Sequence, residues 1–272
     1  MTSNDEERAS IATGTNFPVV CYEEPLWRGP ASWRSLAAEF AGAALLVALT
    51  CLATCAEPRP APPHRALASG LVVTLIVQCF DHVSGAQLNP TVTLAAVVTG
   101  RVTAAAGALE AGAQLAGAAC GGALLRLLAP APVPDSYCVT APAAGLPIYK
   151  AVGIEAVLGA SLAWANCAAW DARTRRLRDS WPLRVGLSVA ALSFVAGDMT
   201  GASMNPARSF APALWSGDWS HQWVYWAGPL SGSALAAALY RAVWRAPPSA
   251  APRGVPSDTT ATHTEQKSRR ST

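Results

Sequence analysis

The chain has 272 residues, of which 51% are hydrophobic and only 14% are charged, whereas an average soluble domain is roughly one quarter charged. This composition indicates an integral membrane protein. The formal net charge of +3 is small, and no dense basic and aromatic face that could stack bases is present, so we exclude a nucleic-acid partner.

Six apolar segments are long enough to cross the hydrocarbon core of a bilayer, which is about 30 Å thick. They lie at about residues 35–56, 66–83, 104–128, 148–169, 183–199 and 222–245. The third contains Gly117 and Gly121, and the sixth contains Gly228 and Gly232. Such spaced glycines favour close helix contacts inside a bundle. The segments predict an all-α membrane protein.

A short pattern occurs twice at a separation of 116 residues. The two copies are Asn89-Pro90-Thr91 and Asn205-Pro206-Ala207, each after a Gly-Ala pair. A glutamate inside an apolar segment lies 50 residues before each Asn. This glutamate is Glu39 in the first half and Glu155 in the second. The chain is therefore an internal duplication, with repeats at about 35–128 and 148–245.

Each Asn-Pro pair predicts the start of a short helix, because Asn is a good N-cap and Pro suits the first helical position. The helices expected at 90–99 and 206–214 would rise roughly 15 Å, about half of the bilayer core. An odd number of spans in each half inverts the second half relative to the first. The sequence thus predicts six transmembrane helices plus two re-entrant half-helices whose positive amino ends meet at the midplane, where a substrate path is expected.

The ends of the chain differ from the six-span domain at 35–245. Residues 1–34 form a polar tail without the basic and apolar profile of a cleaved signal peptide. Residues 246–272 are rich in Pro, Ser, Thr and charge, which predicts disorder. The loop at 171–178 carries four arginines, so the positive-inside rule places this loop and both termini in the cytoplasm.

Seven cysteines are present, most of them inside apolar segments, where we expect small buried thiols. These five are Cys51, Cys55, Cys79, Cys120 and Cys167. No cysteine spacing is typical of a metal site or a disulfide. No Ser, Cys or His arrangement pairs a nucleophile with a base, so the sequence predicts no enzyme, no cofactor and no metal.

The paired Asn-Pro motifs, the paired glutamates and the six spans in inverted halves resemble the aquaporin or major intrinsic protein family, over about residues 30–245. The resemblance implies a plasma-membrane channel for small uncharged molecules that forms a homotetramer in the lipid bilayer, with one pore in each subunit. It also implies that Glu39 and Glu155 brace the backbone of the half-helix loops, in preference to relaying protons. Thr91 departs from the alanine usual in the family, yet we expect the site to survive.

Asn89 and Asn205 can each offer an amide donor to a molecule at the midplane. With the positive half-helix ends behind them, the two donors force a permeant oxygen to accept hydrogen bonds, which interrupts a proton relay and repels cations. This mechanism is a general one for pores of this type.

Selectivity in the family comes from four positions at an outer constriction. Local spacing from the two motifs matches them to Ser69, Ser193, Ala202 and Arg208. Water-selective members carry a bulky aromatic residue at the first position and usually His at the second. Serine at both predicts a wide polar opening whose hydroxyls can exchange hydrogen bonds with a polyol, a pattern resembling the insect glycerol-permeable aquaporins.

The sequence therefore predicts a passive channel for water, glycerol and urea. Two alternatives remain open. One is a water-selective channel with a loose filter, because several residues around the second motif are like those of water-selective members. These residues are Ser209, Ala213, Tyr225 and Trp226. The other is an adhesive or signalling membrane protein with an idle pore, which Thr91 and the long tail permit, but the intact Asn89, Asn205 and Arg208 argue against it.

Overall fold

The computed structural model describes residues 31–55, 61–129 and 137–245, and within these ranges the chain contains helices and loops without a β-strand. The helices are α2 (Trp33–Leu52), α3 (Pro62–Ser84), α4 (Pro90–Val98), α5 (Ala104–Leu128), α6 (Ile148–Trp170), α7 (Trp181–Thr200), α8 (Pro206–Ser216) and α9 (Val224–Leu239). A 3-10 segment, η1 (Ala172–Ser180), joins α6 to α7, and a π-helical segment, η2 (Tyr240–Trp244), follows α9. The predicted tails fall outside the described residues, apart from 31–34.

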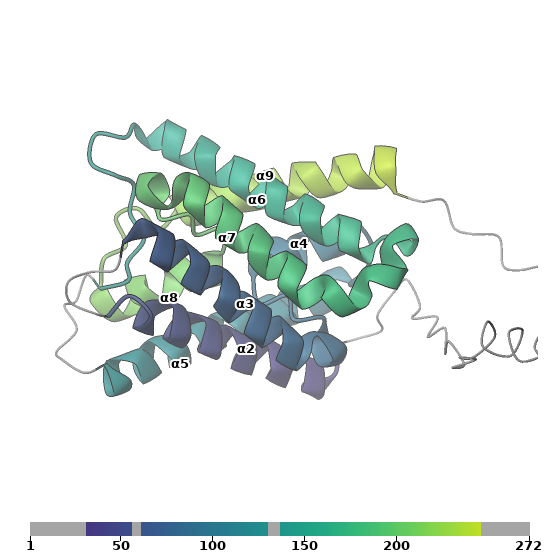
Figure 1. The fold of residues 1–272 in the computed structure, drawn as a ribbon, viewed down its shortest axis with the longest axis horizontal. Helices are drawn as coiled ribbons and strands as arrows, with labels where there is room; N and C mark the ends of the chain where they lie inside the picture. Colours follow the sequence, from purple (N-terminus) through teal and green to yellow (C-terminus); the bar gives the residue numbers. More distant parts are fainter. Residues whose placement is uncertain (1–30, 56–60, 130–136, 246–272) are drawn as a thin grey trace, which may run out of the picture.

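The all-α fold with two half-helices is confirmed (Figure 1). Five helices of the described residues are long and apolar enough to cross a membrane. The sixth predicted span, at 222–245, begins as the 16-residue α9 and continues as η2. Helix α3 begins at Pro62, four residues before the predicted start, because Pro62 and Pro63 suit a first helical turn, where no backbone donor is needed.

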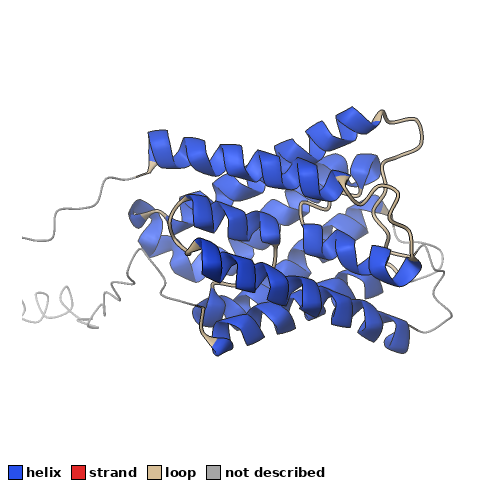
Figure 2. Cartoon of the chain, turned by 180° about the vertical axis from the view of Figure 1, so that it is seen from behind, coloured by secondary structure: helices blue, strands red, loops and turns tan. Residues whose placement is uncertain are grey.

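The duplication is visible in the packing. Helix α2 packs on α5 as α6 packs on α9, and α3 of the first half packs on α7 of the second. The start of α2 and the end of η2 lie at the same end of the bundle (Figure 1), and Figure 2 shows from behind that loops also run between the helices in the middle of the bundle. The end of the bundle where α2 ends and α3 begins is called the outer end below.

Glycines bring the paired helices into backbone contact. A Cβ at Gly117 or Gly121 of α5 would collide with backbone carbonyls of α2, and one at Gly228 or Gly232 of α9 would collide with α6. The predicted role of these glycines in close contacts inside the bundle is therefore confirmed.

The prediction of five buried thiols is wrong in four cases. Cys51 forms a disulfide with Cys138, 87 residues away, because the loop between α5 and α6 folds back against the end of α2. Cys79 and Cys120 are exposed on the outside of the bundle, and Cys55 is half-buried. Of these five cysteines, Cys167 is the one that is a buried free thiol. Sequence separation carries no signal for a bond of this kind, since it depends on how a long loop returns.

Candidate functional site

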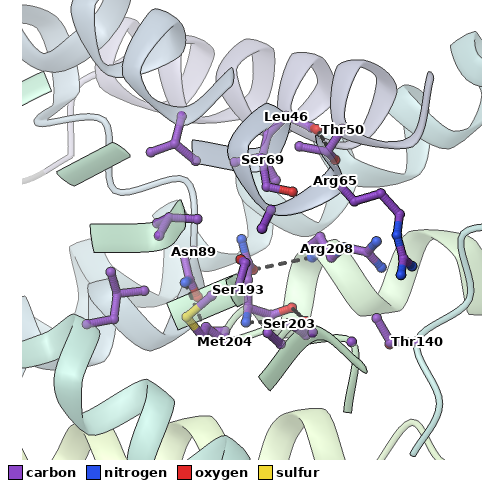
Figure 3. Close-up of a pocket in the computed structure, with 18 of the residues that line it drawn as sticks. Leu46, Thr50, Arg65, Ser69, Asn89, Thr140, Ser193, Ser203, Met204 and Arg208 are labelled. Carbon is purple, nitrogen blue, oxygen red and sulfur yellow. Dashed lines mark hydrogen bonds between the residues drawn. The ribbon is translucent and has the colours of Figure 1, made fainter. Parts of the chain in front are cut away.

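A cavity of about 610 Å³ lies between the long helices and the two re-entrant loops (Figure 3). Six of the residues predicted from the sequence line it: Ser69, Asn89, Ser193, Ala202, Asn205 and Arg208. The other predicted residues are buried behind this wall: Glu39, Pro90, Thr91, Glu155, Pro206 and Ala207. The cavity also reaches Asn166 of α6 and Trp181 of α7. It therefore extends on both sides of the Asn pair.

The two asparagines are held in fixed orientation where the half-helices meet. Asn89 Oδ1 accepts a hydrogen bond from Thr91 N at 2.8 Å, and Asn205 Oδ1 accepts one from Ala207 N at 2.9 Å, so each residue caps its own half-helix. Each amide nitrogen then donates one bond across to the other loop, to Met204 O from Asn89 and to Leu88 O from Asn205, both at 3.0 Å. An amide has two N–H donors, so each Asn keeps one donor for a molecule in the cavity.

The loops that carry the asparagines have an unusual backbone. Ala86, Leu88, Ala202 and Met204 have positive φ values of 43°, 57°, 44° and 54°, in equivalent pairs. This left-handed conformation costs roughly 1–2 kcal/mol for each residue with a Cβ. Both loops therefore need strong local interactions to hold them.

Two buried carboxylates supply these interactions, and both are fully shielded from solvent. Each accepts two backbone N–H bonds from the residues just before an Asn and one bond from a hydroxyl before the loop glycine. The donors are Ser84 Oγ (2.6 Å), Gln87 N (3.0 Å) and Leu88 N (2.7 Å) for Glu39, and Thr200 Oγ1 (2.7 Å), Ser203 N (3.0 Å) and Met204 N (2.9 Å) for Glu155. Hydrogen bonds to a charged acceptor are about twice as strong as neutral ones.

The first loop has additional side-chain contacts from α5. Gln114 Nε2 donates to Glu39 at 2.8 Å and to Thr93 Oγ1 at 2.9 Å, and Gln87 Nε2 donates to Glu110 at 2.8 Å. Glu110, a third buried acidic residue, was not predicted from the sequence, because the second repeat has no matching glutamate. An ionisable residue within a span was the available signal.

The predicted filter residues come from three elements at the outer side of the Asn pair. Ser69 lies on α3, Ser193 on α7, and Arg208 in the first turn of α8, with Ala202 in the preceding loop (Figure 3). None of the four is aromatic. Arg208 donates to the Cys138 carbonyl at 2.9 Å and to Cys138 Sγ at 3.3 Å, so the loop between α5 and α6 forms part of the same wall.

The comparisons with known proteins agree with this architecture. The family model for major intrinsic proteins matches residues 26–240. The chain belongs to the major intrinsic protein family. This major intrinsic protein is 36% identical to aquaporin-4 of Bos taurus over 203 residues, which cover 72% of the chain and 63% of that relative. It is 46% identical to aquaporin TIP4-4 of Zea mays over 165 residues, which cover 60% of the chain and 64% of that relative. The alignments therefore span a little under two thirds of these relatives.

Among solved structures, the aquaglyceroporin from Plasmodium falciparum has a TM-score of 0.71 and 22% identity, covering 77% of this major intrinsic protein and 96% of that chain. This similarity shows a shared fold. The family assignment expected from the two Asn-Pro motifs is confirmed, and members of this family are membrane channels, not enzymes.

Three features of the site in this major intrinsic protein were not predicted. They are the contact of Arg208 with Cys138, the buried Glu110, and an ion pair between Arg65 of α3 and Asp198 of α7 at 3.0 Å. The ion pair lines the outer rim of the cavity, one helical turn from Ser69. Because its side chains are 34% and 66% exposed, the pair contributes little stability. Within the described ranges, no three His, Cys, Asp or Glu side chains gather to form a metal site.

Proposed function

We propose that this protein is a passive membrane channel for water and small uncharged solutes, chiefly glycerol and also urea. The observation that carries the proposal is the pairing of Ser69 and Ser193 around one cavity with Arg208. Two hydroxyls can donate to or accept from a polyol, while the guanidinium only donates. A solute with several hydroxyl groups thus finds both kinds of partner where it has lost bulk water.

The Asn pair accounts for the exclusion of ions and protons in this proposal. The free N–H of Asn89 and of Asn205 lies at the positive ends of two half-helices. A permeant oxygen therefore accepts at the midplane and cannot pass a proton on. At the Asn pair a cation meets donors and positive potential, and Arg208 adds a positive charge at the filter, so the hydration that the cation loses at the midplane is not replaced there.

A water-selective channel is the second candidate function. It is favoured by the names of the relatives, which are aquaporin-4 and aquaporin TIP4-4. The two candidates share the Asn pair and Arg208, so they differ in the width and polarity of the opening at Ser69 and Ser193.

Proteoliposomes of purified protein separate the candidates. Sorbitol outside shrinks the vesicles at a rate set by water flux, whereas glycerol or urea outside causes shrinkage followed by re-swelling as the solute enters. We expect re-swelling well above that of protein-free vesicles. Rapid shrinkage with re-swelling no faster than in lipid alone would identify a water-selective channel, and no acceleration of either process would identify a non-conducting protein.

Ser193→His tests the filter assignment directly. The imidazole fills space in the opening, so glycerol flux should fall much more than water flux, because the larger solute loses clearance first. Ser193→Ala is the matched control, since it removes the hydroxyl without filling the opening. One hydrogen bond is worth about 0.5–1.5 kcal/mol, so the alanine variant should lose glycerol flux by only about 2–13-fold. Equal loss of water and glycerol flux in the histidine variant would contradict the assignment.

We also propose a plasma-membrane homotetramer with both termini in the cytoplasm. The disulfide at the outer end supports this orientation, because disulfides persist in oxidising compartments. The arginines of η1, at the opposite end, support it through the positive-inside rule. Antibody to a terminal tag should bind expressing cells only after permeabilisation, and labelling of intact cells would contradict the cytoplasmic termini. The mass of the protein in detergent should equal four chains, and the mass of one chain would contradict the tetramer.

A further inference from the structure

The disulfide at the outer end joins two parts of the chain that meet at the filter. Cys51 lies in the last turn of α2, and Cys138 lies in the loop between α5 and α6, with Cα atoms 5.7 Å apart. Cys138 also lines the cavity. The bond therefore ties the wall of the cavity to a membrane-spanning helix.

Cys138 is also the residue that holds the filter arginine. Its carbonyl oxygen accepts from Arg208 Nη1 at 2.9 Å, and its sulfur accepts from Arg208 Nη2 at 3.3 Å. Both acceptors belong to Cys138, so the position of the Arg208 guanidinium depends on the position of Cys138. The backbone of Cys138 has φ 62°, which is costly for a residue with a Cβ and which needs external restraint.

The neighbouring contacts of the loop are non-covalent, and they include packing of Tyr137 and Cys138 against the apolar core of the bundle. The Tyr137 hydroxyl donates to Cys51 O at 2.8 Å and contacts Thr54 Oγ1 at 2.7 Å, and the Thr140 hydroxyl donates to Ser209 Oγ at 2.7 Å. Thr54, Tyr137 and Thr140 line the cavity, and one hydrogen bond of this kind contributes only about 0.5–1.5 kcal/mol. The disulfide is the covalent link among these contacts.

We propose that the Cys51–Cys138 disulfide is a positioning element of the selectivity filter, which keeps Arg208 against the wall and so keeps the opening at Ser69 and Ser193 wide. The inference rests on the proposed function. Without the disulfide, the carbonyl and the sulfur of Cys138 move with the loop. The Arg208 guanidinium has five N–H donors and no acceptor, so it then forms hydrogen bonds with other acceptors nearby. The hydroxyls of Ser69 and Ser193 line the same cavity, and a guanidinium directed at them narrows the path.

The first test uses folded protein in proteoliposomes and a charged, membrane-impermeant phosphine as reductant. The phosphorus attacks one sulfur and the S–S bond breaks; water then converts the phosphonium to the phosphine oxide and supplies the protons of the two thiols. We expect the ratio of glycerol to water permeability to fall several-fold and to recover after reoxidation. A ratio that is unchanged or raised after verified reduction overturns the proposal.

The second test uses Cys51→Ser, which removes the bond and leaves Cys138 in place as a free thiol. The matched control is Cys55→Ser, four residues further along the chain and just beyond the end of α2, where the cysteine is free and half-buried. Cys51→Ser should lower the permeability ratio and make water flux sensitive to a mercurial, because the Cys138 thiol now lines the cavity. Cys55→Ser should behave as wild type in both measurements.

The outcomes distinguish this inference from the proposed function. If oxidised wild type conducts water without glycerol, the proposed solute range is wrong, and water flux alone then decides the inference: it should fall on verified reduction and recover on reoxidation, and an unchanged water flux overturns the inference. If wild type conducts glycerol and Cys51→Ser matches Cys55→Ser in both measurements, the inference is wrong and the proposed function stands. If Cys51→Ser fails to fold, the reduction of folded wild type decides.

Discussion

Glu155→Ala should destabilise the second re-entrant loop and close the channel. The change removes the acceptor of three buried donors, Thr200 Oγ1, Ser203 N and Met204 N. At about 1–3 kcal/mol for each orphaned donor, the loss is about 3–9 kcal/mol. The effect reaches the pore through Met204, whose N–H is held by Glu155 and whose carbonyl accepts from Asn89.

Two further variants grade the effect. Glu155→Gln can keep the oxygen that accepts from Thr200 and Ser203, and it loses the bond from Met204 N, so its cost should be about 1–3 kcal/mol. Glu39→Ala should cost at least as much as Glu155→Ala, since Glu39 accepts from four donors, including Gln114.

The assay combines thermal unfolding of purified protein with water and glycerol flux in proteoliposomes. We expect stability to decrease in the order wild type, Glu155→Gln, Glu155→Ala, with flux lost in the alanine variant. An alanine variant that unfolds at the wild-type temperature and conducts normally would refute the bracing role of the carboxylates. A glutamine variant as damaged as the alanine variant would show that charge, and not the number of hydrogen bonds, decides the effect.

Three further predictions concern the pore wall and the helix contacts. Arg208→Val should keep neutral-solute flux and add a proton or ammonium current in voltage-clamped cells, whereas the wild type stays silent; current through wild type would contradict the account of charge exclusion. Ala202→Cys should make the pore sensitive to mercurials, because Ala202 lines the cavity, and an insensitive variant would show that this position is not reached. Gly232→Ala should lower stability by about 1–3 kcal/mol, because the added Cβ meets the Ala156 carbonyl, while Gly153→Ala, with open space around it, should be harmless. Equal stability of the two glycine variants would argue against tight packing of α6 on α9.

Local chemistry explains why much of the fold was predictable. An Asn-Pro pair starts a helix through contacts within three residues, and the observed caps of α4 and α8 involve Asn89 with Thr91, and Asn205 with Ala207. Apolar length predicted the spans, although their ends differ by a few residues, as helix ends commonly do. The repeat itself predicted that the two halves would be built alike, since equal sequence patterns impose equal local structure.

The sequence by itself thus determined the helices, the duplication and several of the residues that line the cavity, among them Asn89, Asn205 and Arg208. Only the tertiary structure decided which of these residues hold one another. The contacts of Arg208 with Cys138, of Cys51 with Cys138 and of Arg65 with Asp198 join residues 70, 87 and 133 positions apart. Such pairs depend on how the loops return across the bundle. Spacing along a chain fixes which residues share one helix face, but helix packing fixes which faces meet.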